Sequence, residues 1–218
     1  SLNSATATAI SPALIANNFL QTNNGSGYQT VYLNYLQNVN IYHNNINATG
    51  TGNGFYYTST AGQNINIVNN IVKANGVAIY ISSPSAIGQI NYNNYYTAGA
   101  ELGYWGSSVA TALSAWQALS GQEAKSLSVD PQYRSPSDLE SLASSLAGAG
   151  LDLTAIVPLD IKGNTRTVPV SIGASQFSAL FSVDGSVTRI ITPVSSCVLK
   201  NAEEVKIEIT NLGASAIS

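Results

Sequence analysis

Hydrophobic and polar residues alternate in short runs along the first hundred residues, and turns rich in Gly and Asn separate these runs. Runs of three to six residues with a period of two predict β-strands, not helices. The order of strand and turn repeats along the chain instead of being mirrored, so simple hairpins cannot connect the strands. The clearest alternating segments are 30–35, 40–46, 55–58, 65–71, 77–81 and 89–95.

An Asn-Asn pair accompanies each repeat. With spacings of 27, 25 and 24 residues, the pairs stand at 17–18, 44–45, 69–70 and 93–94. A period of roughly 20–50 residues is typical of stacked supersecondary units. Equivalent strands that pair in parallel from coil to coil would form a β-solenoid with apolar interior rows. We expect Val31, Tyr57 and Ile79 to line one such row, with a register irregularity beside the third Asn pair.

Asparagine suits the turns of such a solenoid for two reasons. Its short side chain tolerates left-handed backbone conformations and hydrogen-bonds the neighbouring backbone. Amides of successive coils can also bond to each other along the solenoid axis. We therefore predict a structural amide ladder through Asn18, Asn45, Asn70 and Asn94.

The alternating pattern ends near residue 96, and a helical pattern follows it. Residues 108–119 place apolar side chains on one face of a helix, with Ser107 or Ser108 as the N-cap. A solenoid needs such a cover on its last coil because apolar rows and strand edges would otherwise face water. Two further strands, 189–193 and 204–210, are too few to form a core of their own.

These patterns divide the chain into two parts. Residues 1–177 are predicted to form a parallel β-helix with a helix-containing C-terminal cap, the coils covering about 14–100 and the cap about 101–177. Residues 178–218 would begin a β-sandwich module whose other strands we expect beyond Ser218. The predicted fold class is all-β: a parallel β-helix (solenoid), its cap and a partial sandwich-like tail.

Longer motifs support this interpretation. The coils with Asn-Asn pairs resemble the right-handed parallel β-helix repeat proteins of the pectate-lyase-like group. Two segments of this chain, AWQALSGQE (115–123) and SLSVDP (126–131), resemble the segment that connects the helix to the last coil in that group. Its closing motif looks like DIKGNTR (160–166) with IGASQF (172–177), so the resemblance covers about residues 14–177.

The segment from Val183 resembles the start of the Ig-like adhesion modules that follow such β-helices in large surface proteins. Together the two resemblances imply a secreted or cell-surface protein of bacteria. They also imply that further domains of the same parent chain are partners of this segment.

Charge is scarce and unevenly distributed. Charged residues make up 9% of the chain, and residues 1–100 contain Lys73 and His43 but no Asp or Glu. The net charge of −3 and the lack of a Lys/Arg cluster argue against nucleic acid as a partner. No stretch of 18 apolar residues exists for membrane insertion, and Cys197 is the only cysteine, which excludes a disulfide framework.

The placement of the acidic residues bears on catalysis. The resemblance implies enzymes that act on acidic polysaccharides: lyases with carboxylate-bound Ca²⁺ and hydrolases with clustered aspartates. Residues 1–100 supply no such carboxylates, so we predict no catalytic residue, no metal site and no cofactor. We expect His43 to be an exposed turn histidine and Lys73 to be a solvated lysine before a turn.

These observations favour a non-catalytic fragment of a large secreted or cell-surface bacterial protein, acting as a scaffold or in contact with carbohydrate. Two alternatives stay open. The chain could belong to a polysaccharide lyase or glycoside hydrolase whose catalytic residues lie outside it or in the cap loops. It could also be an adhesin with a protein ligand.

Tyrosines are the best candidates for binding. The chain has twelve, and alternation points Tyr32, Tyr56 and Tyr80 outward. Aromatic rings beside amides suit a polysaccharide, since rings pack on sugar faces and amides bond hydroxyls. The alternative is that tyrosine simply fits half-buried strand positions.

Among the later ionisable residues, the most charged group is Asp130, Arg134, Asp160 and Arg166. We expect these four to form ion pairs and turn caps that hold the C-terminal cap together. Glu101 and Glu123 have no evident partner in the sequence.

Overall fold

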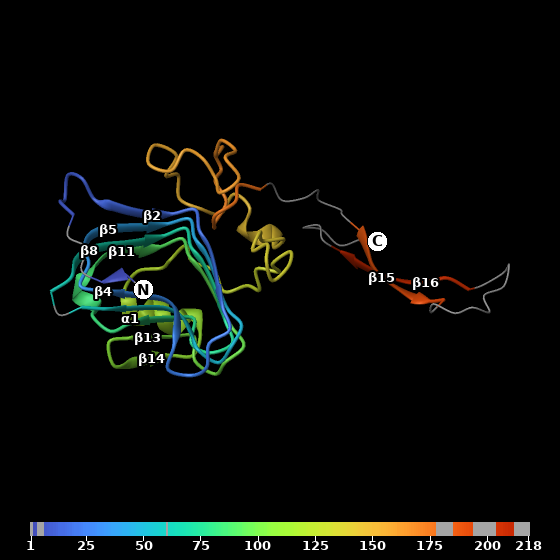
Figure 1. Ribbon diagram of the computed structural model, residues 1–218, viewed down its shortest axis with the longest axis horizontal. Coiled ribbons are helices and arrows are strands. Elements are labelled where there is room, and N and C mark those ends of the chain that lie inside the picture. Colours follow the sequence, from blue (N-terminus) through green and yellow to red (C-terminus); the bar gives the residue numbers. More distant parts are fainter. Residues whose placement is uncertain (1, 4–6, 60, 178–184, 194–203, 212–218) are drawn as a thin grey trace.

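The structure of the chain is a computed structural model that describes residues 2–3, 7–59, 61–177, 185–193 and 204–211 (Figure 1). About four turns of chain stack into a parallel β-solenoid, which confirms the predicted fold class. Each turn contributes one strand to each of three sheets, here named A, B and C. No helix in the described segments is long and apolar enough to span a membrane.

Sheet A has the strand order β1-β4-β7-β10-β13-β14. All neighbouring strands in it are parallel except β13 and β14. Its strands are β1 (Leu2–Asn3), β4 (Gln29–Asn34), β7 (Asn53–Thr58), β10 (Ile79–Ile81), β13 (Gly103–Trp105) and β14 (Ser108–Ala110).

Sheets B and C are parallel throughout, with the orders β11-β8-β5-β2 and β12-β9-β6-β3. Sheet B contains β2 (Ala13–Ala16), β5 (Gln37–Tyr42), β8 (Gln63–Val68) and β11 (Ile87–Asn91). Sheet C contains β3 (Phe19–Thr22), β6 (Asn45–Ala48), β9 (Ile71–Ala74) and β12 (Asn94–Thr97). The chain therefore passes from sheet B to sheet C to sheet A in every coil.

Equivalent inward residues of successive coils form the hydrophobic core. In sheet B, Ile41, Ile67 and Ile90 lie in one row, and none is more than 2% exposed. The corresponding buried row of sheet C consists of Ile46, Val72 and Tyr95. Removing apolar surface from water stabilises the stack by about 25 cal/mol per Å².

The predicted interior row of Val31, Tyr57 and Ile79 is wrong in one member, Tyr57. Val31 pairs with Phe55, which in turn pairs with Ile79. Tyr57 lies in the next inward row, opposite Ile81. Because side chains alternate with a period of two, an error of two residues leaves a side chain on the same face, and alternation alone does not detect it.

The register irregularity expected beside the third Asn pair does not occur there. Strands β8 and β9 pair with the preceding coil at a constant offset. The register shifts instead between Ile87 and Gln89, where β11 pairs with β8. This shift directly follows the short helix η1 (Pro84–Ala86).

The cap contains a helix, but the helix begins later than predicted. Residues Ser108–Ala110 form β14, antiparallel to β13, so neither Ser107 nor Ser108 caps a helix. Helix α1 spans Leu113–Ser120 and buries Trp116 completely. A strand forms at β14 because it pairs with the otherwise open edge of β13.

Residues 127–177, named the wrap below, lie against the outer face of sheet C and against the last residues of the sheet B strands (Figure 1). The wrap includes the short helix η2 (Ser144–Leu146). Two apolar clusters attach it, one with Ile71, Leu146 and Ile172, the other with Tyr42, Val68 and Val157. No apolar cluster or hydrogen bond between described residues links the wrap to sheet A, so the outer face of sheet A stays uncovered by it.

Beyond the wrap, β15 (Gly185–Thr192) and β16 (Lys206–Asn211) form an antiparallel hairpin, in agreement with the two strands expected there. Its assignment to an Ig-like module stays a prediction. Cys197 lies outside the described residues.

Candidate functional site

Side-chain amides at one corner of each coil form a ladder along the solenoid axis. Each Nδ2 donates to the Oδ1 of the next coil, at N–O distances of 2.8, 2.9 and 3.2 Å. The members are Asn18, Asn44, Asn70 and Asn93. A ladder of the expected kind exists. The assignment of Asn45 and Asn94 to it is wrong, because each stands one residue after the ladder position, which Asn44 and Asn93 occupy.

A left-handed residue precedes each ladder amide, with φ between 54° and 59°. Asn17 and Asn69 occupy this position in the first and third coils, so the Asn pair there ends on the ladder. His43 and Tyr92 occupy it in the second and fourth coils, so the Asn pair there begins on the ladder. All four pairs look equivalent in the sequence because Asn suits both the left-handed position and the ladder.

The Asn residues beside the ladder bind the backbone of the wrap. Asn69 donates to the carbonyl of Leu151 and accepts from the N–H of the same residue, both at 2.8 Å. Asn94 likewise donates to the carbonyl of Val129 and accepts from the N–H of Val129, both at 3.0 Å. Sequence analysis missed this second role, because the partners lie 35 to 82 residues away in the chain.

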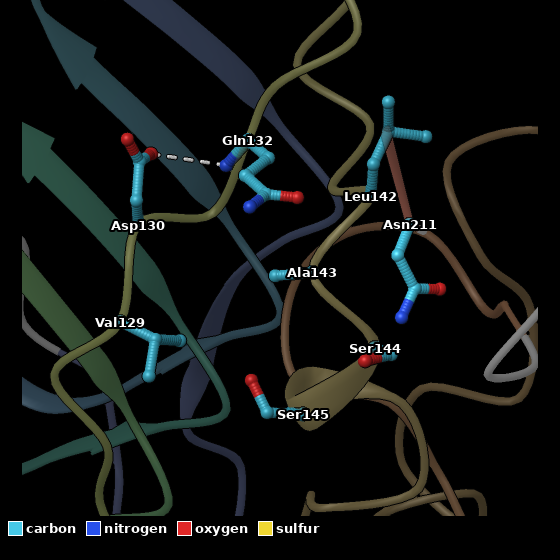
Figure 2. Close-up of a pocket in the computed structure, with 8 residues that line it drawn as sticks. All are labelled: Val129, Asp130, Gln132, Leu142, Ala143, Ser144, Ser145 and Asn211. Carbon is cyan, nitrogen blue, oxygen red and sulfur yellow. Dashed lines mark hydrogen bonds between the residues drawn. The ribbon is translucent and has the colours of Figure 1, made fainter. Parts of the chain in front are cut away.

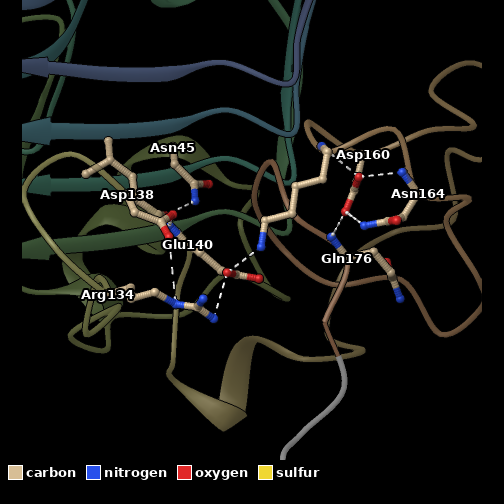
Figure 3. Close-up of polar contacts among 9 residues, drawn as sticks. Asn45, Arg134, Asp138, Glu140, Asp160, Asn164 and Gln176 are labelled. Atoms are coloured by element: carbon tan, nitrogen blue, oxygen red, sulfur yellow. Dashed lines mark hydrogen bonds and ion pairs between the residues drawn. The ribbon is translucent and has the colours of Figure 1, made fainter.

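Two more amides extend this docking row. Asn45 donates to the carbonyl of Leu139 at 2.6 Å (Figure 3). Asn17 donates to the carbonyl of Leu159 at 2.7 Å and accepts from Arg166 at 2.8 Å. One member of each Asn pair therefore joins the coils, and the other fastens the wrap to them.

His43 is fully buried, so the expectation of an exposed turn histidine is wrong. Its Nδ1 donates to the carbonyl of Gly173 at 3.0 Å, and its Nε2 accepts from Asn69 Nδ2 at the same distance. Burial lowers the pKa of His43 to about 3, and the nearby cation Arg166 acts in the same direction. The imidazole is thus neutral at neutral pH and serves as one more attachment point for the wrap.

Replacing His43 with Asn should make the protein less sensitive to acid. An unfolded histidine takes up its proton near pH 6.5, whereas folded His43 does so only near pH 3. Between these values the unfolded state binds more protons, so stability falls as the pH falls. From pH 7.5 to 4.5, we expect His43→Asn to lose about 2–3 kcal/mol less unfolding free energy than the parent.

Urea unfolding of both proteins at the two pH values tests this expectation. Carboxylates that titrate in the same range are common to both proteins, and they cancel in the comparison. Asn is the matched replacement because it already occupies the left-handed position in the first and third coils. Equal losses in the two proteins would contradict the buried neutral state of His43.

The four predicted cap charges do not meet in one place. Asp130 accepts from Lys73 at 2.7 Å, so Lys73 is paired and not simply solvated. Arg134 contacts Glu140 at 2.8 Å, and Glu140 also binds Lys162 at 2.6 Å (Figure 3). The first ion pair joins the wrap to sheet C, and the other two connect segments within the wrap.

Asp160 and Arg166 act through backbone groups. Asp160 accepts from the N–H groups of Lys162, Asn164 and Gln176 at 2.8 to 3.0 Å (Figure 3). Burial favours the neutral acid, but these hydrogen bonds outweigh it and leave the pKa of Asp160 lower than usual. Arg166 is 3% exposed, and it donates to the carbonyl of Ala174 at 2.8 Å.

Both glutamates thought to lack a partner have one. Buried Glu123 accepts from Tyr95 at 2.8 Å, from Trp116 Nε1 at 3.0 Å and from the hydroxyl of Ser126. Its burial raises the pKa of this carboxyl. Glu101 accepts from the hydroxyl of Tyr104.

A cavity of about 260 Å³ lies between the wrap and Asn211 (Figure 2). Asp130 is the only ionisable residue among those that line it. One carboxylate oxygen of Asp130 already accepts from Lys73 and from the N–H of Gln132. In the described part of the chain, no group of three or more His, Cys, Asp or Glu side chains could hold a metal ion.

The predicted tyrosines lie together in one row on the outer face of sheet A. Tyr32, Tyr56 and Tyr80 pair in register, and Tyr104 of β13 extends the row. Ring centroids of successive coils are 5.5, 4.7 and 4.7 Å apart. Sequence analysis missed Tyr104, although a constant spacing of 24 residues connects all four.

Stacking determines which parts of these rings a ligand can reach. The faces of Tyr56 and Tyr80 are covered by neighbouring rings on both sides, so sugars cannot pack on them as we expected. The side chains are only partly exposed and offer ring edges and hydroxyls. Within the described structure, no hydrogen bond occupies the hydroxyl of Tyr32, Tyr56 or Tyr80.

A second polar row runs beside the tyrosines. Asn34 pairs with Thr58, and Ser82 donates to the Thr58 hydroxyl at 2.7 Å. Each of these residues lies two positions after a tyrosine, which places it on the same side of the sheet. We name the two rows together the tyrosine face: Tyr32, Tyr56, Tyr80, Tyr104, Asn34, Thr58 and Ser82.

Comparison with known proteins gives no relative for this chain: no protein-family model, no curated protein and no solved structure matches it. The fold and the tyrosine face therefore rest on the geometry described above, and the resemblance to the pectate-lyase-like group rests on its sequence motifs alone.

Proposed function

We propose that this chain is a non-catalytic β-solenoid scaffold that contacts a carbohydrate polymer through the tyrosine face. The observation that carries the proposal is the in-register row of four tyrosines on the outer face of sheet A, which the described residues of the wrap do not contact. Phenolic hydroxyls both donate and accept hydrogen bonds, as do sugar hydroxyls. A regular row of such groups suits a polymer whose units repeat.

The placement of the charged groups favours binding over catalysis. Hydrolysis of a glycosidic bond needs two carboxyl groups on either side of one sugar linkage, roughly 5–10 Å apart. Asp130, Asp160 and Glu140 instead bind lysines, an arginine or backbone N–H groups of the wrap. Glu123 is enclosed by the cap and does not reach a surface.

The sequence resemblance adds a setting to this proposal: a secreted or cell-surface bacterial protein with an Ig-like module after the solenoid. One feature of the hairpin supports further packing on it. Its paired residues Val187 with Ile209, and Ile190 with Ile207, are apolar and 43–62% exposed. A strand face of this kind is normally covered by a second sheet.

Electrophoresis through gels that contain single polysaccharides tests the proposed contact. We expect at least one glycan to retard the parent protein. Tyr56→Phe combined with Tyr80→Phe removes two free hydroxyls and keeps the rings in place. At about 0.5–1.5 kcal/mol per hydrogen bond, the double variant should bind roughly 5- to 150-fold more weakly.

The control is Tyr28→Phe, a tyrosine that is 66% exposed and lies outside the row. It should be retarded like the parent. Loss of retardation in both variants would point to a general effect of tyrosine content, and retardation by no glycan at all would contradict the proposed function.

A further inference from the structure

We propose that the tyrosine face takes an uncharged, hydroxyl-rich glycan that lies along the solenoid axis, and that Glu101 marks a subsite for one sugar unit beside Tyr104, the last tyrosine of the row. This inference rests on the proposed function. It adds the class of the ligand, the direction in which the ligand lies and one subsite at Glu101. Three features of the surface carry it: its charge, its repeat and the cavity beside Glu101.

The tyrosine face carries no cation that could pair with an acidic sugar. None of the described strands of sheet A contains Lys or Arg. Lys73 belongs to β9 of sheet C and is held by Asp130. Acidic polysaccharides are normally bound through Arg, Lys or Ca²⁺, because each carboxylate loses hydration when it binds. A neutral glycan has no such requirement.

The two rows of the tyrosine face run across the strands, from coil to coil. Equivalent groups in neighbouring strands are about 4.7–4.9 Å apart. A ligand lying parallel to the strands would meet only one coil, whereas a ligand along the axis meets the same hydroxyls at every coil. Because neighbouring rings cover the faces of Tyr56 and Tyr80, such a ligand is held by hydrogen bonds at the ring edges.

Glu101 stands where the tyrosine row ends. One of its carboxylate oxygens accepts from Tyr104, and Glu101 is one of the residues that line a cavity of about 190 Å³. Asn53, Gly76 and Gly99 line the same cavity, which therefore extends beside the beginnings of β7, β10 and β13. Its volume equals that of about six water molecules, which is room for one sugar ring and not for several.

A carboxylate suits a sugar subsite because two adjacent hydroxyls can donate to it together. The same carboxylate repels a uronic acid or a sulfated sugar at that place. Glu101 therefore both binds a neutral unit and rejects an anionic one.

The experiment compares neutral, acidic and cationic polysaccharides in affinity gels, with the parent, Glu101→Gln and Asp152→Asn. Asp152 is exposed on the wrap, away from sheet A, so Asp152→Asn makes the same change in net charge. We expect a neutral glycan to retard the parent most. Glu101→Gln should weaken that retardation about fivefold, because a charge-assisted hydrogen bond becomes a neutral one, and Asp152→Asn should not.

The outcomes separate this inference from the function on which it rests. Retardation by acidic or cationic glycans alone would overturn the ligand class but leave a carbohydrate-binding solenoid. If a neutral glycan retarded Glu101→Gln as strongly as the parent, the subsite at Glu101 would be overturned. Retardation by no glycan would overturn the proposed function itself. Thermal melting of each variant shows whether a weaker retardation reflects loss of the fold.

Discussion

Replacing Ile67 with Asp is expected to unfold the solenoid. Ile67 is 1% exposed and lies between Ile41 and Ile90 in the interior row of sheet B. A carboxylate there would have apolar neighbours in both adjacent coils and no hydrogen-bond donor among them. The penalty for burying an unpaired charged or polar group, added to the lost packing, exceeds about 4 kcal/mol.

The damage should spread beyond one coil. Each unit of a repeat structure is stabilised by its neighbours, so a disrupted third coil also weakens the second and the fourth. Since a natural domain is stable by only about 5–15 kcal/mol, we expect the variant to lose its cooperative unfolding transition or most of its stability. Circular dichroism during thermal and urea unfolding measures this directly.

Asn66→Asp is the matched control, since it introduces the same side chain one residue earlier. Asn66 points outward and donates to Asn40 Oδ1 at 2.9 Å. Rotation of the Asn40 amide lets it donate to the new carboxylate, so we expect a change within about 1 kcal/mol. If Ile67→Asp unfolded like Asn66→Asp, the assignment of inward and outward faces would be wrong.

The same inward and outward alternation accounts for what the sequence could predict. Apolar residues at every second position, repeated with the Asn pairs, are sufficient to predict parallel strands and stacked coils. They do not determine which coil residues face each other, because strand pairing tolerates a shift of two residues without a change of face. This is why Tyr57 was assigned to the row of Val31, one inward row from its place opposite Ile81.

Contacts of the wrap and of the segment around helix α1 could not be predicted from the sequence pattern. His43 is buried because a carbonyl 130 residues later in the chain approaches its ring. Glu123 is satisfied because strand β12, helix α1 and the following turn bring Tyr95, Trp116 and Ser126 to one carboxylate. The partner of His43 is remote in the chain, and the partners of Glu123 lie 3 to 28 residues away in different elements, so strand alternation predicts neither arrangement.

The tyrosine face was partly predictable. Alternation correctly pointed Tyr32, Tyr56 and Tyr80 away from the core, and the spacing of 24 residues extends the row to Tyr104. The mutual stacking of the rings was not predictable in the same way, because it depends on side-chain rotation within a strand spacing of about 4.8 Å. That stacking changes the expected mode of binding from ring faces to hydroxyl groups.

Replacing Asn70 with Ala is the second change for which we expect a large loss of stability. Asn70 is 1% exposed and stands in the middle of the amide ladder. Its Oδ1 accepts from the backbone N–H and the Nδ2 of Asn44 at 3.0 and 2.9 Å. Its Nδ2 donates to the carbonyls of Ile41 and Val68 at 2.7 and 3.1 Å.

Alanine would leave several of these buried groups without this partner, at about 1–3 kcal/mol each, so we expect a loss of about 3–5 kcal/mol. Asn66→Ala removes one hydrogen bond between side-chain amides at a partly exposed position. Water can replace the lost partner there, so the change should cost less than about 1 kcal/mol. Urea unfolding of both variants, compared at equal m-values, gives the difference. A loss at Asn70 no larger than the loss at Asn66 would mean that the amide ladder does not hold the coils together, and that the apolar rows alone do.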